Sequence, residues 1–449
     1  MRLCGCLLLA VLPASAALEA GVAAVDLTPS HPVPLAWRTK PPTREVYHPL
    51  RLHALALADG HTRVVLVTAD IGYFCRDLTE QIHTRVRRLG LRPHQVFLNA
   101  SHNHSAPALC PLDDVVEPGA LDYGYQQFVI GRAAAAIESA LATRQPARLA
   151  TAESTCDVCI NRRGGGPDIS PNPAGPNDRR VRLLTVRDAG SGALRAVVSL
   201  FACHPSDVDN GQLGADFFGF AQTEFTRRHP GVPLLTAQGV GGNLRLAHLD
   251  ASGNKFARTT DSELSFVREA GATLAAAVSA ALGRETPVEG PIRSSLLEIR
   301  IPLAEPVRLG EARQAAASPD PWKARWGQRL LDLAERHAEL PRSLPYWIHA
   351  ITMGTDFAAV GLDGEVFVEY AGLIEKQLAP MRVYVFGYTN ASLAYIPTAQ
   401  AVSEGGYEVE VFYWWLLPAR ISPAAETRIV DAAVSLVREL SQTPARMRL

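Results

Sequence analysis

Three histidines stand directly after stretches that are predicted to be buried strands. His102 and His104 follow the apolar stretch 95–100, and His204 follows the stretch 196–201. The carboxyl ends of strands are where α/β folds place their sites. Residues two apart on extended backbone point to one face, so His102 and His104 can serve one pocket, which His204 can join if the strands are neighbours. Neutral imidazole is a common zinc ligand, so this placement suggests a metal site.

A structural role is the competing interpretation for each of these histidines. A histidine at a strand end can simply be held by hydrogen bonds to the chain around it. The sequence contains no HExxH pattern, so spacing supplies no further ligand. The residues alone therefore leave both interpretations open.

Alternating strands and helices are expected to position these residues. Apolar runs predict strands at 63–68, 95–100, 181–186, 196–201, 233–237, 295–301, 357–360 and 382–388. Helical spacing predicts helices at 77–89, 123–142, from about 218, at 261–282, at 308–337 with a break at Pro319 and Pro321, and at 423–440. The alternation favours an α/β fold with mixed β-sheets flanked by helices, in a single large domain. The Gly-, Pro- and Asn-rich stretch 164–177 is predicted to be a surface loop within that domain.

Composition and charge set limits on the class of protein. The chain has 449 residues, 47% of them apolar, with a formal net charge of −1. This balance is typical of a folded protein with a core and supplies no field to collect nucleic acid. Arg2, the apolar stretch 3–12 and the small residues 14–16 predict a cleaved signal peptide at 1–17, hence a secreted or periplasmic protein whose domain runs from 18 to 449. No other segment is apolar enough to be a transmembrane span.

Five cysteines remain after the predicted signal peptide: Cys75, Cys110, Cys156, Cys159 and Cys203. Five is an odd number, so they cannot all pair. The CxxC formed by Cys156 and Cys159 has no second ligand pair for a zinc knuckle. The cysteines can be buried or paired, can form one local disulfide, or can be functional, and the sequence does not decide whether Cys156 and Cys159 are bonded.

Four short segments occur in an order that carries a resemblance: 67–70 (VTAD), 100–107 (ASHNHSAP), 201–205 (FACHP) and 214–219 (GADFFG). Together they resemble the N-terminal catalytic domain of the neutral/alkaline non-lysosomal ceramidases, over about residues 23–400. The resemblance implies a ceramidase-like zinc hydrolase, since that family uses Zn²⁺ to hydrolyse the amide of N-acylsphingosine, a sphingolipid.

The resemblance also implies roles for individual residues. His102 and His204 match the zinc histidines, and His104 matches the partner that faces the substrate. The GEVF segment at 364–367 places Glu365 as the carboxylate ligand, and the NASLAYI segment at 390–396 places Tyr395 as the tyrosine ligand. Two imidazoles and one carboxylate are typical of a catalytic zinc site, which keeps a position open.

Substrate-side positions include one that matches the family and two that depart from it. Arg162 matches an arginine that lies in the family's active site. The family's essential serine is replaced by Arg245, and the preceding aspartate by Asn243. The family's longer members carry a C-terminal immunoglobulin-like domain, which is not expected here. A fixed cation at Arg245 favours an anionic or polyhydroxylated substrate over ceramide, so Asn243 and Arg245 are expected on the substrate side.

Three functions follow from these observations. The first is a secreted zinc-dependent hydrolase that cleaves an amide or ester with metal-activated water, with His104 and Arg162 as catalytic residues. The second is a zinc-dependent enzyme acting on an exported glycan, for which the aromatic run 412–415 can be a stacking platform or only the edge of a core. The third is a non-catalytic binding protein with a degenerate site. The expected partner is a small-molecule lipid or glycan, no nucleic acid is expected, and the oligomeric state stays open.

Overall fold

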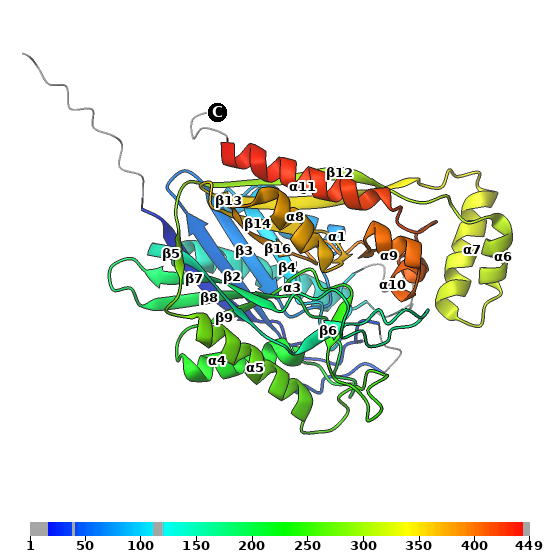
Figure 1. Ribbon diagram of the computed structural model, residues 1–449, viewed down its shortest axis with the longest axis horizontal. Coiled ribbons are helices and arrows are strands. Elements are labelled where there is room, and N and C mark those ends of the chain that lie inside the picture. Colours follow the sequence, from blue (N-terminus) through cyan, green and yellow to red (C-terminus); the bar gives the residue numbers. More distant parts are fainter. Residues whose placement is uncertain (1–16, 38–40, 111–118, 120, 443–449) are drawn as a thin grey trace, which may run out of the picture.

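A nine-stranded sheet forms the main framework of the protein (Figure 1). The computed structural model describes residues 17–37, 41–110, 119 and 121–442, so all but the last residue of the predicted signal peptide lies outside it. The strands run in the order β4, β3, β2, β1, β5, β7, β8 and β9, with β11 beside β5. Their bounds are β1 Glu19–Asp26, β2 Arg51–Ala58, β3 Arg63–Ala69, β4 Val96–Ala100, β5 Gln145–Thr155, β7 Arg180–Asp188, β8 Leu194–Phe201, β9 Leu234–Gln238 and β11 Thr286–Val288.

The two end strands of this path, β4 and β9, meet through one side chain. The Asn99 amide donates to the Gln238 carbonyl at 3.1 Å, and its Oδ1 accepts from the Gln238 N–H at 2.8 Å. The fully buried Asn99 side chain thus makes the two hydrogen bonds that a neighbouring strand's backbone would otherwise make with Gln238. The sheet therefore curls until its ends adjoin, and the loops after β4 and β8 come together.

A second sheet packs against the inside of the first. It contains β12 (Ile292–Pro302), β13 (Ser343–Met353), β14 (Phe357–Leu362) and β16 (Arg382–Phe386). One core cluster joins Leu55, Phe97 and Val198 of the first sheet to Ile351 and Phe386 of the second. The two sheets therefore share an apolar interior, and helices cover their outer faces.

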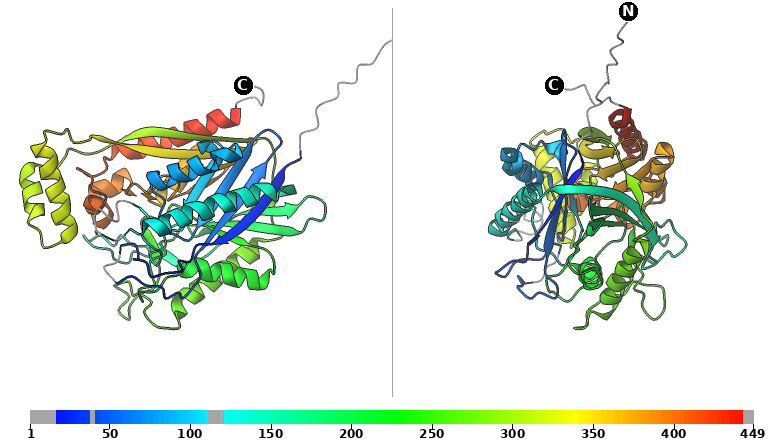
Figure 2. Two further views of the ribbon diagram at one scale, coloured as in Figure 1. Left: turned by 180° about the vertical axis from the view of Figure 1, so that it is seen from behind. Right: turned by 90° about the vertical axis from the view of Figure 1, so that its left-hand side faces the viewer.

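The helices form two outer layers (Figures 1 and 2). On the first sheet lie α1 (Arg76–Val86), α3 (Tyr123–Ala142), α4 (Asp216–Arg228) and α5 (Ser265–Ala281), and on the second lie α8 (Glu369–Leu378) and α11 (Ala424–Gln442). The helices α6 (Leu309–Ala316) and α7 (Pro321–Glu335) form a hairpin that projects from one end, next to α9 (Ala399–Glu404) and α10 (Tyr407–Glu410). No helix in the described ranges has both the length and the apolarity needed to cross a bilayer.

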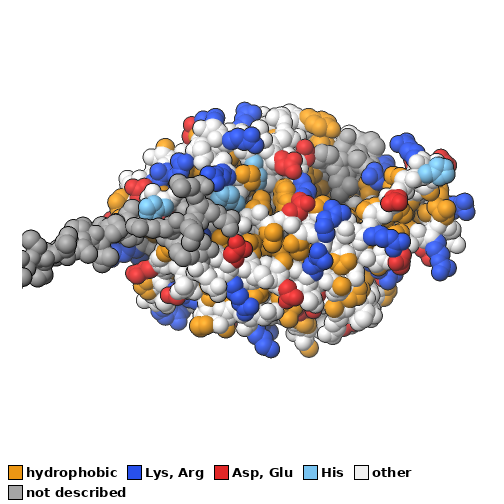
Figure 3. Space-filling model, turned by 90° about the horizontal axis from the view of Figure 1, so that it is seen from above, with side chains coloured by type: hydrophobic (Ala, Val, Ile, Leu, Met, Phe, Trp, Pro, Cys, Tyr) orange, Lys and Arg blue, Asp and Glu red, His pale blue; other side chains and the backbone are white. Residues whose placement is uncertain are grey.

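The predicted architecture is confirmed: the chain is a mixed α/β domain whose sheets are flanked by helices. The helices α3 and α11 lie where helical spacing predicts them, and the predicted break near Pro321 separates α6 from α7. The stretch 164–177 is a mostly exposed loop, as expected. In the view of Figure 3, acidic and basic side chains are interspersed on the surface, in keeping with the small net charge.

Two short strand pairs complete the fold and hold site residues. β6 (Cys159–Asn161) runs antiparallel to β10 (Leu244–Leu246). β15 (Glu365–Val366) runs parallel to β17 (Tyr395–Ile396), with Glu365 directly opposite Tyr395. Directly opposed residues in a ladder point to one side, so this pair brings the Glu365 and Tyr395 side chains to a common face.

Candidate functional site

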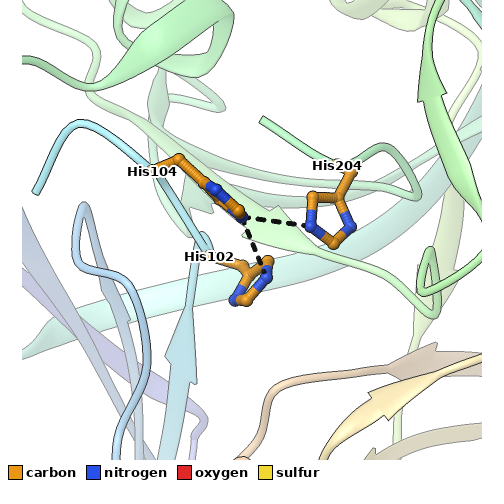
Figure 4. Close-up of side chains that lie close together, drawn as sticks. All are labelled: His102, His104 and His204. Atoms are coloured by element: carbon orange, nitrogen blue, oxygen red, sulfur yellow. Dashed lines mark hydrogen bonds between the residues drawn. The ribbon is translucent and has the colours of Figure 1, made fainter. Parts of the chain in front are cut away.

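The three histidines meet, as predicted (Figure 4). His104 Nε2 lies 3.4 Å from His102 Nε2 and 3.2 Å from His204 Nε2. The reason differs from the one predicted, since His102 has a φ of 62° and is not extended. His204 joins them because the sheet curls, as β4 and β8 are not neighbours in it.

Neighbouring groups fix the orientation of the imidazoles. His102 Nδ1 lies 3.0 Å from the Gly72 carbonyl, which can only accept, so Nδ1 carries the hydrogen and Nε2 presents a lone pair. The His102 ring stacks on Tyr388 at 4.4 Å between centroids, and Trp37 packs at 5.0 Å from His102 and 4.6 Å from His104. Burial, followed by the positive charge of Arg162, lowers the pKa of His204 well below its usual value. His204 is therefore neutral in this setting.

Glu365 completes the cluster. Its Oε2 lies 3.2 Å from His102 Nε2 and 3.7 Å from His204 Nε2, and the side chain is buried. Among the described residues, Oε2 has no hydrogen-bond partner. The turn into β15 needs a glycine at 364, where φ is +93° and a Cβ would lie 2.7 Å from the Ala394 carbonyl. The backbone thus places a buried carboxylate oxygen against the Nε2 atoms of two imidazoles.

Tyr395 and Arg162 lie at the edge of this cluster. Arg162 Nη2 donates to the Tyr395 hydroxyl at 2.9 Å, and its Nε donates to Glu408 Oε1 at 2.9 Å. Arg163 donates to Glu408 Oε2, also at 2.9 Å. Burial opposes the charge on Arg162, but the surrounding tyrosine and glutamate oxygens raise its pKa above the usual value. Arg162 is therefore a permanent cation whose position is fixed by Glu408.

Asn243 lies beside the chain segments that form the site. Its Oδ1 accepts from the Val368 N–H at 2.9 Å, and its Nδ2 donates to Glu369 Oε2 at 2.9 Å. Its carbonyl accepts from the Arg162 N–H. The side chain is fully buried, so in this structure it joins the start of α8 to the strand pair of β6 and β10. The predicted substrate contact of Asn243 stays a prediction.

Arg245 is buried and makes its contacts away from the histidines. Its Nη2 donates to the Ala257 carbonyl at 3.1 Å, its guanidinium lies 5.0 Å from the centre of the Phe256 ring, and Asp207 Oδ1 is 3.9 Å away. Burial, with a smaller effect of Arg258, lowers the pKa of Arg245 to about 10. Its side chain does not point to solvent, since the residue is only 6% exposed.

Two disulfides brace the loops that carry the histidines. Cys75 pairs with Cys110, and Cys159 pairs with Cys203, next to His204. Cys156 is free and buried, so the CxxC is not an internal pair. Disulfides form and persist in oxidising compartments, which agrees with the predicted export.

Four further residues contact the cluster and were not singled out from the sequence. Trp37 and Tyr388 pack on the imidazoles, Glu408 holds Arg162, and Asp207 faces Arg245. Tyr388 ends the strand predicted at 382–388, Asp207 follows the segment 201–205, and Glu408 precedes the aromatic run 412–415. None of these patterns predicts a contact with the site, because each contact joins residues from separate parts of the fold.

The cluster fits a divalent cation. A buried carboxylate oxygen without a partner is costly unless a cation neutralises it. Glu365 Oε2 is in this position, and the nearest nitrogens are Nε2 atoms, one of which, on His102, has its hydrogen on the opposite side of the ring. Imidazole nitrogen and carboxylate oxygen are the donor types that zinc prefers. The atoms of His102, His104 and His204 that could serve as ligands also lie within 4.8 Å of one another.

The fold is similar to those of solved structures described as ceramidases. One is a neutral ceramidase from Pseudomonas aeruginosa, with a TM-score of 0.73, 19% sequence identity, and coverage of 97% of this chain and 76% of that one. Another is a ceramidase complexed with C2, with a TM-score of 0.73, 18% identity, and coverage of 97% and 77%. No family model matches the sequence, and no curated protein sequence does. At these identities the likeness establishes the fold, which agrees with the resemblance seen in the motifs.

Proposed function

We propose that this protein is a zinc-dependent hydrolase that cleaves an amide or ester bond. The observation that carries the proposal is the buried Glu365 Oε2, which faces the Nε2 atoms of His102 and His204 and has no hydrogen-bond partner in the part of the chain that the structure describes. The similarity of the fold to that of ceramidases supports the same class of reaction. Exported zinc hydrolases are also compatible with disulfides, and two are present.

His102, His204, Glu365 and Tyr395 would hold the metal. Zinc bound there supplies an activated water at neutral pH and polarises the substrate carbonyl. Tyr395 is kept in reach by the hydrogen bond from Arg162, and burial, opposed by Arg162, raises the pKa of Tyr395 well above its usual value. Tyr395 is therefore protonated in the metal-free protein.

His104 and Arg162 are the proposed catalytic residues. The His104 imidazole lies against both zinc-ligand histidines and can carry a proton between water and the leaving group. Arg162 presents a fixed positive charge at the base of the site, where it can stabilise the negative charge that develops on the carbonyl oxygen. Its other nitrogen remains bound to Glu408, so it needs no reorientation to do so.

A second ligand set is favoured by one observation. The three imidazoles converge without Glu365, and His104 Nε2 is the atom nearest to both of the others. In that arrangement His104 is a ligand and not a proton carrier. His104→Gln separates the two sets, because it removes a ligand in one and only the acid–base group in the other.

Zinc stoichiometry tests the proposed function. Elemental analysis should give about one zinc per chain for the parent protein and little for His204→Ala. His61→Ala is the control, because His61 is exposed and far along the chain from the site. A screen of acyl amides, acyl esters and acylated sugars then tests hydrolysis. A parent protein that neither holds nor takes up zinc would refute the proposal.

A further inference from the structure

A row of aromatic rings runs from the candidate site to the projecting hairpin. Tyr395 and Tyr407 have ring centroids 6.1 Å apart, Tyr407 and Trp414 are 5.7 Å apart, and Trp414 and Trp322 are 5.7 Å apart. Tyr407 belongs to α10, Trp414 to the 3-10 helix Val411–Trp415, and Trp322 to α7. Figure 1 shows α10 between the body of the protein and the hairpin of α6 and α7. We call Tyr407, Trp414 and Trp322 the aromatic wall.

The aromatic wall is not part of a closed core. All three of its residues are partly exposed. Core packing of the same region is supplied by Trp326, which is 6% exposed, donates its Nε1–H to the Leu417 carbonyl, and packs edge-on against Phe412. The sequence left open whether the run 412–415 is a stacking platform or a core edge. In the structure Phe412 and Trp414 are both partly exposed and both pack against the core of the second sheet, and Trp414 also contacts Tyr407 and Trp322.

The inner end of the wall reaches the charged groups of the site. Tyr407 is in ring contact with Tyr395, and the Tyr395 hydroxyl accepts from Arg162 Nη2 at 2.9 Å. These two contacts link the wall to residues of the candidate site. A substrate group that extends from the metal past Tyr395 meets Tyr407 next.

Charged side chains flank the wall along its length. Arg163, held by Glu408 and Glu404, lies at its inner end. At the outer end, Asp320 accepts from the Trp322 N–H, and Lys323 lies 5.2 Å from the centre of the Tyr413 ring. An alkyl chain placed here would desolvate these charges without pairing them, which is costly. A sugar ring has an apolar face for the indole and hydroxyls that can bond to carboxylates and cations at its edge.

We propose that the aromatic wall binds a sugar ring, so that the substrate of this hydrolase is an acylated glycan. The proposal rests on the proposed function and names its substrate class. In the reaction, the bond between the acyl carbon and the sugar nitrogen or oxygen breaks, and the acyl carbon takes the oxygen of water. The freed amine or hydroxyl takes a proton, and a carboxylate is released.

Binding of tri-N-acetylchitotriose to the metal-free protein tests the wall independently of catalysis. Isothermal titration calorimetry should show binding by the parent after chelation. Trp414→Ala and Trp322→Ala should each weaken it by about tenfold, the scale of one aromatic stacking contact. Trp414→Phe should restore part of the loss. Tyr123→Ala, at an aromatic residue that is 60% exposed at the start of α3, is the matched control and should change nothing.

The results separate the wall from the proposed function. Failure of the parent to bind the oligosaccharide, or equal binding by the tryptophan variants, would refute the proposal that the aromatic wall binds a sugar ring. So would a loss in Trp414→Ala of binding to phosphatidylcholine vesicles that contain N-acylsphingosine, because the occupant would then be a lipid. Hydrolysis that is insensitive to Trp414→Ala would refute the wall and leave the hydrolase standing. Tryptophan-dependent sugar binding without any hydrolysis would refute the hydrolase and leave the sugar site standing.

Discussion

The histidine cluster (His102, His104, His204 and Glu365) lies beside the arginine cluster (Arg162, Arg163 and Glu408). Each contains one buried glutamate, and the two glutamates have different partners. In the histidine cluster, Glu365 faces imidazoles, and its buried Oε2 has no hydrogen-bond partner among the residues that the structure describes. In the arginine cluster, Glu408 receives one hydrogen bond from Arg162 and another from Arg163, both at 2.9 Å. Two glutamates of similar burial, 3% and 4% exposed, therefore have very different surroundings. The difference indicates that Glu365 can take a cation from solution, whereas Glu408 is already paired with two arginines of the chain.

This contrast assigns different tasks to the two clusters. A fully paired buried ion cluster fixes geometry, because moving any member leaves an uncompensated charge. A buried carboxylate oxygen that faces imidazoles and has no partner among the described residues is suited to bind a cation. Arg162 links the two tasks, since it is held by Glu408 on one side and reaches Tyr395 on the other. Predictions about the two glutamates should therefore differ in sign.

Glu408→Gln should produce the largest effect. The substitution leaves Arg162 buried beside a neutral amide, and breaking a buried pair costs about 3–5 kcal/mol of unfolding free energy. Urea unfolding of the metal-free protein measures it. Glu404→Gln is the control, because Glu404 is exposed. Its contact with Arg163, at 3.4 Å, is a surface ion pair that contributes little to the free energy of unfolding. A stability of Glu408→Gln equal to that of the parent would contradict the view that this cluster fixes geometry.

Glu365→Gln should act in the opposite direction in the metal-free protein. It removes a buried charge whose Oε2 has no partner within the described ranges, so the metal-free variant should be at least as stable as the parent. The same change should weaken zinc binding by about a hundredfold, or about 2.7 kcal/mol, because a ligand charge is lost. Competition with a fluorescent chelator measures the affinity, and thermal unfolding after chelation measures the stability. A variant that is strongly destabilised without metal and still binds zinc normally would show that Glu365, like Glu408, stabilises the fold and does not bind the metal.

Asp70 offers a third buried carboxylate, placed among neutral donors only. The Arg51 N–H donates to Oδ2 at 3.0 Å and Gln222 to Oδ1 at 3.3 Å. Burial raises the pKa of Asp70 to about 7, above the ordinary value of 3.8. Between these values the folded protein binds more protons than the unfolded chain, so this group favours folding at low pH and the benefit is lost as pH rises through about 7.

Asp70→Asn should therefore flatten the pH dependence of stability. The contribution of one proton is about 1.4 kcal/mol per pH unit, so the parent should lose about 2 kcal/mol more than the variant between pH 5 and pH 7. Urea unfolding at several pH values measures the slope. Asp77→Asn, on the exposed side of α1, is the control. Equal slopes for the parent and Asp70→Asn would show that Asp70 is ionised in the folded protein.

The sequence predicts the strands that end at the site better than the partners that complete it. β3, β4, β8 and β9 are continuous apolar runs, as expected for strands buried on both faces. β1 and β2 were not predicted, because β1 contains Gly21 and several alanines and β2 alternates only weakly. The curl of the sheet was not predictable either, because it depends on Asn99 meeting Gln238, 139 residues away.

The same limit applies to the site residues. The histidines could be found because each follows a recognisable strand. Glu365 and Tyr395 were reached through the family resemblance alone, since β15 and β17 are only two residues long and give no periodic signal. The helix predicted at 77–89 begins one residue earlier, because α1 starts at Arg76 with Cys75 as its N-cap, and that cysteine is held by its disulfide to Cys110. Long-range contacts decided each of these points, and a local pattern does not contain them.

Arg245→Met should have the smallest effect on stability. It therefore tests whether Arg245 contributes to substrate binding more than to folding. The Arg245 Nε has no partner among the described residues, and its nearest carboxylate oxygen is 3.9 Å away, so little pairing is lost. Asp207 keeps its bonds from His248 at 2.9 Å and from Thr259, and methionine fills a similar volume. The free energy of unfolding should fall by about 1–2 kcal/mol, because one hydrogen bond to a carbonyl and one long contact with Asp207 are lost. If Arg245 is on the substrate side, as the sequence predicts, KM for an acylated sugar should rise severalfold while kcat changes little, because a uniform binding contact is lost. A fall in kcat with an unchanged KM would instead place Arg245 with Arg162 among the groups that act on the reacting atoms.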